Sequence, residues 1–200
     1  MFKLKIIKLA NMLIEKGISK KEDKEIIVYG LTSGIEIIFN IITTIVLGVF
    51  WGLIVESLVF LISFSMIRVY AGGYHCKKAI NCYLFSSLIV ILVLGIVKFI
   101  PEGDTIVFSM IMLLISLPII LKLAPMETPT KPLDKEEQKY FRKKMVQNLN
   151  VQCAVMLVLF LSELDRYVLV VGLGIAMSAG LVVLQQIQIK RKKRDYDYEI

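Results

Sequence analysis

Six long apolar stretches constrain the fold of this 200-residue sequence more than any other feature. A segment that crosses a bilayer as a helix needs about 20 predominantly apolar residues, with about 17–25 tolerated. A soluble domain of this length has no core large enough to bury six such segments. We therefore predict an all-α, polytopic membrane bundle of about six transmembrane helices, at residues 26–48, 51–67, 83–100, 105–124, 149–162 and 167–187.

The first 25 residues follow a different pattern, in which apolar and basic side chains are interleaved. Phe2, Ile6, Leu9 and Leu13 recur at helical spacing, and lysines occupy much of the remaining surface. This pattern is typical of an amphipathic helix on an anionic membrane surface, and equally of a helix packed on the rest of the protein. We treat residues 1–200 as one membrane domain, with an amphipathic segment 1–25, a bundle 26–187 and a charged tail 188–200.

Basic residues are confined to segments that alternate along the chain. The 24 Lys and Arg exceed the 17 Asp and Glu, and such an excess is also typical of nucleic-acid-binding proteins. Here 22 of the 24 lie in four segments, and the intervening connections hold the other two. The positive-inside rule places these segments, and both termini, in the cytoplasm of a cell-membrane protein. No nucleic-acid partner is needed to explain the charge, because topology accounts for the segments at 1–25, 68–78, 122–144 and 190–199.

Polar side chains recur along one face of the first span. Ser33, Glu36, Asn40 and either Thr43 or Thr44 are spaced three or four residues apart, which places them on one helical face. A charged residue inside a span faces the bundle interior and frequently marks a functional site. The stripe therefore fits either a substrate-contacting groove or an interhelical hydrogen-bond ladder, and for Glu36 both interpretations stay open. Glu56, near the outer end of the second span, is interpreted as structural.

The stretch from Arg68 to Cys82 concentrates the reactive side chains, including the only His of the chain and two of its three Cys. A Cys nucleophile needs a base within hydrogen-bond reach, and His75 can supply it. Cys76 is badly placed because adjacent side chains diverge, whereas Cys82 would lie about 10 Å from His75 along a straight helix. The pair therefore requires a bend, which a helix beginning near Asn81 as N-cap would provide. An interfacial His and an inert Cys are the alternative.

The residues of this stretch follow the pattern Arg-x-x-x-Gly-Gly-x-His, with Cys seven residues later, between two apolar spans. A proline-containing segment at 124–133 follows the fourth span and includes Lys131-Pro132. These two motifs resemble those of the accessory gene regulator B (AgrB) family of membrane endopeptidases. Chain length, span number and basic loops also match, so the resemblance covers essentially the whole chain.

The resemblance implies a site and a reaction. His75 and Cys82 correspond to the catalytic pair of the family, and Arg68 and Gly73 to motif residues needed around it. The family cleaves a small propeptide, AgrD, at the cytoplasmic side through a Cys thioester. An internal thiol or hydroxyl of the substrate then closes a cyclic thiolactone or lactone peptide for quorum sensing. Family members form homodimers among the membrane lipids, and this thiol chemistry needs no metal or nucleotide cofactor.

Four further residues are candidates for substrate or bundle contacts, namely Glu36, Asn40, Lys131 and Pro132. The third, orienting group of the site is not assigned, because Glu36 lies roughly 15 Å into its span and Asn81 is used as a cap. No metal site is expected, since the His and Cys residues lack recognised ligand spacing. The alternative function is a small multi-pass transporter or accessory membrane protein that uses Glu36 and Asn40 as a polar pathway.

Overall fold

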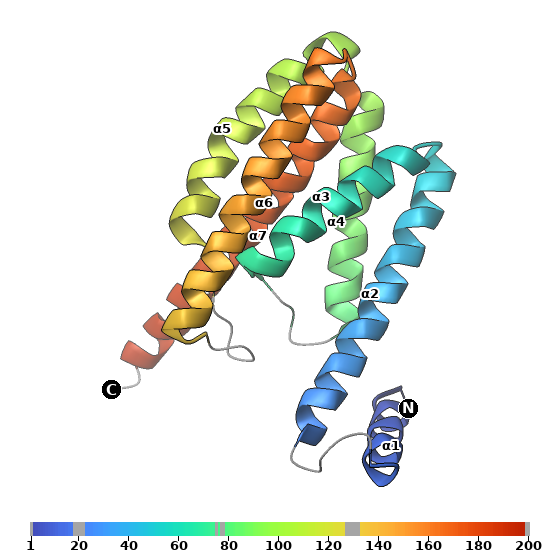
Figure 1. Cartoon of the computed structure of the whole chain (residues 1–200), viewed down its shortest axis with the longest axis vertical. Coiled ribbons are helices and arrows are strands. Elements are labelled where there is room, and N and C mark those ends of the chain that lie inside the picture. Colours follow the sequence, from blue (N-terminus) through green and yellow to red (C-terminus); the bar gives the residue numbers. More distant parts are fainter. Residues whose placement is uncertain (1, 18–22, 75, 77–78, 127–132, 199–200) are drawn as a thin grey trace.

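The computed structural model describes residues 2–17, 23–74, 76, 79–126 and 133–198, and this part of the chain is built from helices with no strand. Six of the helices are long and apolar enough to cross a membrane, as the sequence predicts. They form one elongated bundle (Figure 1). The long helices are α2 (Lys24–Trp51), α3 (Ile54–Ala71), α4 (Ala79–Phe99), α5 (Thr105–Leu123), α6 (Lys135–Leu161) and α7 (Asp165–Tyr198).

The six long helices run alternately up and down, so their connections gather at two ends of the bundle (Figure 1). We call one the basic end, which carries the connections after α3 and α5 and the end of α7. The opposite, turn end carries the short connections. One of these is the turn predicted between the first two spans, where Gly52 adopts a left-handed conformation with φ 70°. Its N–H bonds back to the last turn of α2, which ends that helix.

The N-terminal helix α1 (Phe2–Glu15) packs on α2 near the basic end (Figure 1). Ile6 of α1 is buried, while Leu9 and Met12 stay exposed. The helix thus combines both sequence-based interpretations, because one apolar side chain packs inside the protein and others remain free to enter a membrane surface.

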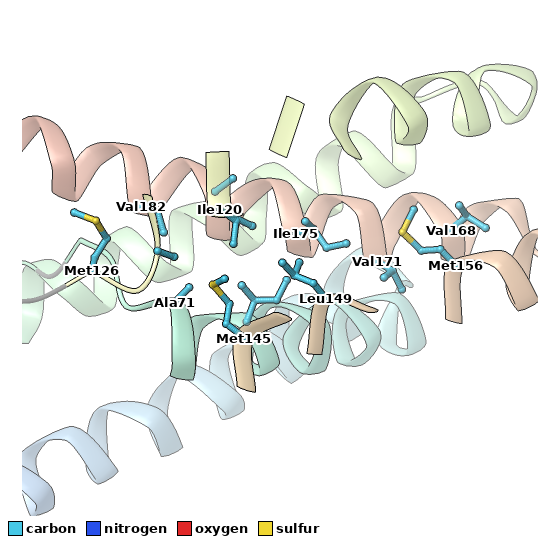
Figure 2. Packing of buried hydrophobic residues seen from close by; sticks show 13 residues of the cluster. Ala71, Ile120, Met126, Met145, Leu149, Met156, Val168, Val171, Ile175 and Val182 are labelled. Carbon is cyan, nitrogen blue, oxygen red and sulfur yellow. The ribbon is translucent and has the colours of Figure 1, made fainter. Parts of the chain in front are cut away.

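Helix α7 is the centre of the bundle, and it contacts α3, α4, α5 and α6. The share of its apolar window that is buried inside the protein is 67%, against 11% for α2. Figure 2 shows Ile120 of α5, Met145 and Leu149 of α6 and Ile175 of α7 meeting in one apolar cluster. Because α7 touches most of the other helices, its packing fixes their relative positions.

Buried polar groups also join α3, α6 and α7. Ser63 Oγ donates to Gln152 Oε1 at 2.8 Å, and Gln152 Nε2 donates to the Ser63 carbonyl oxygen at 2.9 Å. Asn148 Nδ2 donates to the carbonyl oxygen of Met66 at 2.8 Å. Gly174 of α7 lies directly against Ser63, which allows the two backbones to approach closely. These hydrogen bonds fix the register of α6 against α3.

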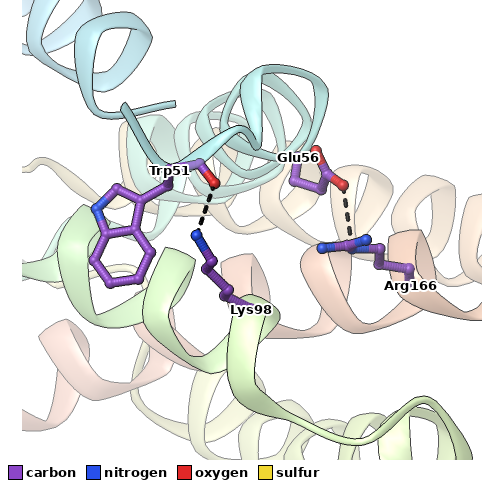
Figure 3. Close-up of polar contacts among 4 residues, drawn as sticks. All are labelled: Trp51, Glu56, Lys98 and Arg166. Carbon is purple, nitrogen blue, oxygen red and sulfur yellow. Dashed lines mark hydrogen bonds and ion pairs between the residues drawn. The ribbon is translucent and has the colours of Figure 1, made fainter. Parts of the chain in front are cut away.

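Two charged contacts fasten the turn end (Figure 3). Arg166 Nε lies 3.1 Å from Glu56 Oε1, which links the start of α7 to the start of α3. Lys98 Nζ donates to the Trp51 carbonyl oxygen at 3.3 Å and lies 5.4 Å from the centroid of the Trp51 ring. Glu56 therefore takes part in a contact between helices, in line with the structural role inferred for it.

Two helix starts differ from the sequence-based boundaries. The apolar pattern places the fifth span at 149–162, but α6 begins at Lys135. Asp134 caps it, because its Oδ1 accepts from the N–H of Glu136 at 2.9 Å and of Glu137 at 2.7 Å. A hydropathy pattern does not detect this start, because the first half of α6 is charged. The assignment of Asn81 as N-cap is wrong, because α4 begins at Ala79 and Asn81 lies inside its first turn.

We expect Gly174→Ala to lower the stability of the bundle. The new Cβ would lie 2.8 Å from Ser63 Cβ and 3.1 Å from the Phe64 nitrogen, and overpacking of this kind costs about 1–3 kcal/mol. Thermal unfolding in detergent, followed by circular dichroism, measures the change. Gly172→Ala is the matched control, because its nearest neighbours would lie 3.6–3.8 Å away. Equal unfolding temperatures for the two variants would contradict the close approach of α3 and α7.

Candidate functional site

The segment after α3 begins with two glycines in conformations that other residues rarely adopt. Helix α3 ends at Ala71, and the N–H of Gly72 donates to the Arg68 carbonyl oxygen at 3.2 Å. Gly72 and Gly73 have φ values of 69° and 121°, which strain any residue with a Cβ atom. This backbone turns the chain sharply away from the helix axis.

The side chain of Arg68 holds this turn in place. Its Nη1 donates to the carbonyl oxygen of Gly72, and its Nη2 donates to that of Tyr74 at 2.5 Å. The two terminal nitrogens of one guanidinium thus donate to two carbonyl oxygens of the same short segment. A Cβ atom on Gly73 would collide with Arg68 Nη1. The glycine is therefore required to let the guanidinium lie flat against the backbone.

Two backbone hydrogen bonds attach the turn to distant parts of the chain. The N–H of Tyr74 donates to the Leu181 carbonyl oxygen of α7 at 3.0 Å. The N–H of Met126, in the segment after α5, donates to the Ala71 carbonyl oxygen at 2.9 Å. The segment that leads towards Lys131 and Pro132 thus begins against the end of α3.

Cys82 lies in the first turn of α4, where the helix dipole presents its positive end. The backbone N–H of Cys76 donates a hydrogen bond to the Cys82 sulfur. Arg68 and Glu36 lie within electrostatic range of the same half-buried sulfur. The backbone of Cys76 and the sulfur of Cys82, six residues apart in sequence, thus lie within hydrogen-bond distance of one another.

Cys76 has a different environment from Cys82. The Tyr74 hydroxyl donates a hydrogen bond to the Cys76 side chain, and this bond raises the pKa of Tyr74 above its ordinary value. The Tyr74 ring packs on Phe85 of α4, with 5.8 Å between ring centroids. The Cys76 sulfur is thus engaged by a side chain of its own segment, while the Cys82 sulfur is held by a backbone N–H.

Helix α2 lines the site from the other side. Thr43 Oγ1 and the Tyr83 hydroxyl lie 2.7 Å apart, and the rings of Phe39 and Tyr83 meet edge to face at 6.5 Å. Tyr83 directly follows Cys82, so the polar stripe of α2 lies beside the first turns of α4. Asn40 Nδ2 donates to the Glu36 carbonyl oxygen at 3.0 Å, so the Asn40 amide is hydrogen-bonded within its own helix.

The structure brings together Arg68, Gly73 and Cys82 of the sequence-predicted site, with Glu36 nearby. His75, Lys131 and Pro132 lie outside the described residues. No group of three His, Cys, Asp or Glu side chains with metal-binding geometry occurs in the described part of the chain. Sequence reasoning missed the contacts of Tyr74, Leu181 and Met126. Those of Leu181 and Met126 are made by backbone atoms, which leave no signal in side-chain patterns.

A cavity of about 330 Å³ lies at the turn end, away from this cluster. Its lining includes Lys98, Glu102, Asp165 and Arg166, and it holds neither a thiol nor an imidazole. Two of the three described thiols, Cys76 and Cys82, lie at the basic end and thus away from this cavity.

The fold defines a multi-pass helical membrane protein, and its basic end carries a cluster that contains Cys76 and Cys82. The model of the family Accessory gene regulator B (AgrB) matches residues 6–189, and the chain belongs to this family. It is 32% identical over 145 residues to a "Putative AgrB-like protein" of Clostridium perfringens strain SM101, which covers 68% of each chain. A protein of the same name from Listeria innocua is 29% identical over 199 residues, covering 95% of this chain and 93% of the relative.

No solved structure matches the chain. Membership of the AgrB family indicates a role in agr quorum sensing, at the stage of propeptide processing.

We expect Gly73→Ala to release the turn from α7. The positive φ and the collision with Arg68 together cost about 1–3 kcal/mol or more. The N–H of Tyr74 should then exchange with deuterium at least about five-fold faster, because local opening becomes easier. Hydrogen exchange followed by mass spectrometry measures this on peptides that cover the turn.

Gly180→Ala is the matched control for this experiment. It lies next to Leu181 in α7, and a Cβ atom there would have no neighbour within 4 Å. The control should leave exchange at Tyr74 unchanged. Exchange at the wild-type rate in Gly73→Ala would show that the hydrogen bonds of Arg68 to the turn do not need the glycine.

Proposed function

We propose that the protein is a membrane-embedded cysteine endopeptidase that cleaves an AgrD-like propeptide at the cytoplasmic side. The observation that carries the proposal is the placement of Cys82. Its sulfur lies at the N-terminal end of α4, accepts a backbone N–H and lies within electrostatic range of the buried end of Arg68. These contacts fix the position of the sulfur, and a positioned thiol with a base in reach can act as a nucleophile.

In the proposed reaction, the Cys82 sulfur attacks the scissile carbonyl carbon while His75 accepts the thiol proton. The tetrahedral intermediate collapses, the C–N bond breaks, and His75 returns the proton to the leaving amine. The product is a thioester between the substrate and Cys82. A thiol or hydroxyl of the same substrate then attacks the thioester, which closes a thiolactone or lactone ring and restores the Cys82 thiol.

The proposed orientation rests on charge. The basic end of the bundle carries the connections after α3 and α5 and the end of α7, which are three of the four basic segments of the sequence. The positive-inside rule places this end in the cytoplasm. The site then faces the compartment in which a propeptide is made. We further propose a homodimer among the membrane lipids, with Lys131 and Pro132 as substrate contacts.

The polar stripe of α2 gives little support to the alternative of a transport pathway. The side chain of Asn40 bonds to the Glu36 carbonyl oxygen, and Thr44 Oγ1 bonds to that of Asn40 at 2.8 Å. Thr43 is paired with Tyr83. These groups hydrogen-bond within α2 or to α4, and this favours a structural role over a path for solutes.

We expect Cys82→Ala and His75→Ala to abolish processing of a co-expressed cognate propeptide, because one removes the nucleophile and the other its base. A positioned general base is worth about 10²–10⁴-fold in rate. Cys76→Ala is the matched control and should leave processing intact. Mass spectrometry of cleaved and cyclised peptide measures the outcome. Full processing by Cys82→Ala would exclude the proposed nucleophile, and loss in Cys76→Ala alone would move that role to Cys76.

Labelling tests the orientation. In a variant that carries Cys76→Ser and Cys153→Ser, Cys82 is the remaining thiol of the chain. A membrane-impermeant maleimide should modify it in inverted vesicles or permeabilised cells and leave it unmodified in intact cells. Labelling of Cys82 in intact cells would place the basic end outside and contradict the proposal.

A further inference from the structure

The charged cavity at the turn end lies away from the cysteine cluster and takes no part in the proposed reaction. Its volume of about 330 Å³ falls within the range of about 300–1,000 Å³ that is typical of small-molecule sites. Helix α4 ends at this cavity and α7 begins there, and the short 3₁₀ helix η2 (Glu102–Asp104) connects α4 to α5 beside it. Side chains of both charges line the cavity, so we asked which ligand they would suit.

Two cationic side chains line the cavity. Lys98 Nζ donates to the Trp51 carbonyl oxygen (Figure 3), which uses one of the three hydrogen bonds that an ammonium can donate. Arg166 is paired with Glu56 through Nε, and its side chain stays 46% exposed. Lys98 and Arg166 can therefore donate to a further acceptor, such as a phosphate, and keep the contacts that fasten the turn end.

Three carboxylates line the same cavity, those of Glu102, Glu163 and Asp165. Glu102 and Glu163 are exposed, and Asp165 is half-buried. Among the described residues, the ion pair at this cavity joins Arg166 to Glu56, so the three carboxylates lie outside it. The lining thus offers acceptors for a cation as well as donors for an anion.

A second, largely apolar hollow continues from this cavity along α5. Ile100 lines both hollows, and the second, of about 360 Å³, is otherwise lined by Asp104, Val107, Phe108 and Ile111. These four residues are spaced three or four apart and lie on one face at the start of α5. From Asp104 to Ile111 the helix extends about 10 Å away from the turn end. The charged cavity thus opens into an apolar groove that follows a membrane span.

The two hollows lie at the depths where a bilayer changes from polar to apolar. Trp51 ends α2, and Tyr167, in the first turn of α7, lines the charged cavity. Trp and Tyr are enriched where a span meets the lipid headgroups, so the charged cavity lies at headgroup level. The groove below it lies at the level of the acyl chains, and its residues Val107 and Ile111 are exposed.

We propose that this end of the bundle binds one phospholipid whose headgroup carries both a phosphate and a primary amine. The phosphate accepts hydrogen bonds from Lys98 and Arg166, and the ammonium donates to the carboxylates that line the cavity. One acyl chain lies in the groove of α5. The site is independent of the proposed peptidase reaction, because no residue of the Cys82 cluster takes part in it.

The charges of the lining distinguish this headgroup from two common alternatives. An anionic headgroup without an amine would place its negative charge among three carboxylates with nothing to neutralise them. A quaternary ammonium has no N–H to donate, so it would not form the charge-assisted hydrogen bonds that carboxylates accept.

Native mass spectrometry of the full-length protein in detergent tests the proposal. The added lipids are phosphatidylethanolamine, phosphatidylcholine and phosphatidylglycerol with identical acyl chains. Phosphatidylethanolamine should bind at least about five-fold more tightly than the other two, the difference that an exposed ion pair of good geometry makes. Equal affinity for the three lipids, or a preference for phosphatidylglycerol, would overturn the proposal.

A double variant, Glu102→Gln with Glu163→Gln, locates the amine site. It should bind phosphatidylethanolamine and phosphatidylcholine equally, and it should unfold at the wild-type temperature because both carboxylates are exposed. Glu25→Gln is the matched control, since Glu25 is an exposed carboxylate in the first turn of α2, at the other end of the bundle. A preference that survives in the double variant, or is lost in Glu25→Gln, would overturn the assignment to this cavity.

A third variant, Val107→Trp, tests the groove without changing any charge. The larger side chain should fill the groove and weaken phosphatidylethanolamine and phosphatidylcholine binding alike. Leu114→Trp is the matched control, because Leu114 is exposed on the same helix and does not line the groove. If Val107→Trp left lipid binding unchanged and altered the oligomeric state, the groove would be a contact between copies of the chain, and the proposal would be wrong.

Discussion

The geometry of the site depends on one guanidinium. Arg68 bridges the carbonyl oxygens of Gly72 and Tyr74, which lie at the end of a membrane-spanning helix where unpaired backbone groups are costly. The bridge sets the path of the chain after α3 and directs the N–H of Tyr74 towards Leu181. A lysine has one ammonium in place of the planar fork, so it cannot hold both oxygens with the same geometry.

The hydrogen bonds of Arg68 to the turn, together with that of Tyr74 to Leu181, connect the site to the buried core. Leu181 belongs to α7, the most buried of the long helices, and Met126 joins the same turn through Ala71. Met126 and Ala71 are themselves members of the apolar cluster around α7. The segment that carries the reactive residues is thus tied by backbone hydrogen bonds to the part of the bundle that opens least readily.

Much of the fold could be predicted from the sequence, because the period and length of apolar segments report directly on membrane spans. The turn at Gly52 follows from the break between two such segments. The start of α6 was not predicted, because its first turn, from Lys135, is charged. The capping box at Asp134 that marks this start is a local polar signal, which a search for apolar segments does not detect. In the site, the need for a bend before Cys82 could be predicted from helix geometry. The partners of Tyr74 could not, since they are backbone atoms from distant segments.

The proposed reaction places a further demand on this site, because a thioester that waits for an internal nucleophile must survive attack by water. Two aromatic contacts lie at the first turns of α4, near the half-buried Cys82, namely Tyr74 with Phe85 and Phe39 with Tyr83. In the proposed reaction, apolar rings near the thiol would reduce the access of water to the thioester. Partial burial of the thiol at the end of a membrane helix would then serve the second step. For the first step, the hydrogen bonds of Arg68 to the turn and of the Cys76 N–H to the sulfur would hold the thiol in a fixed position.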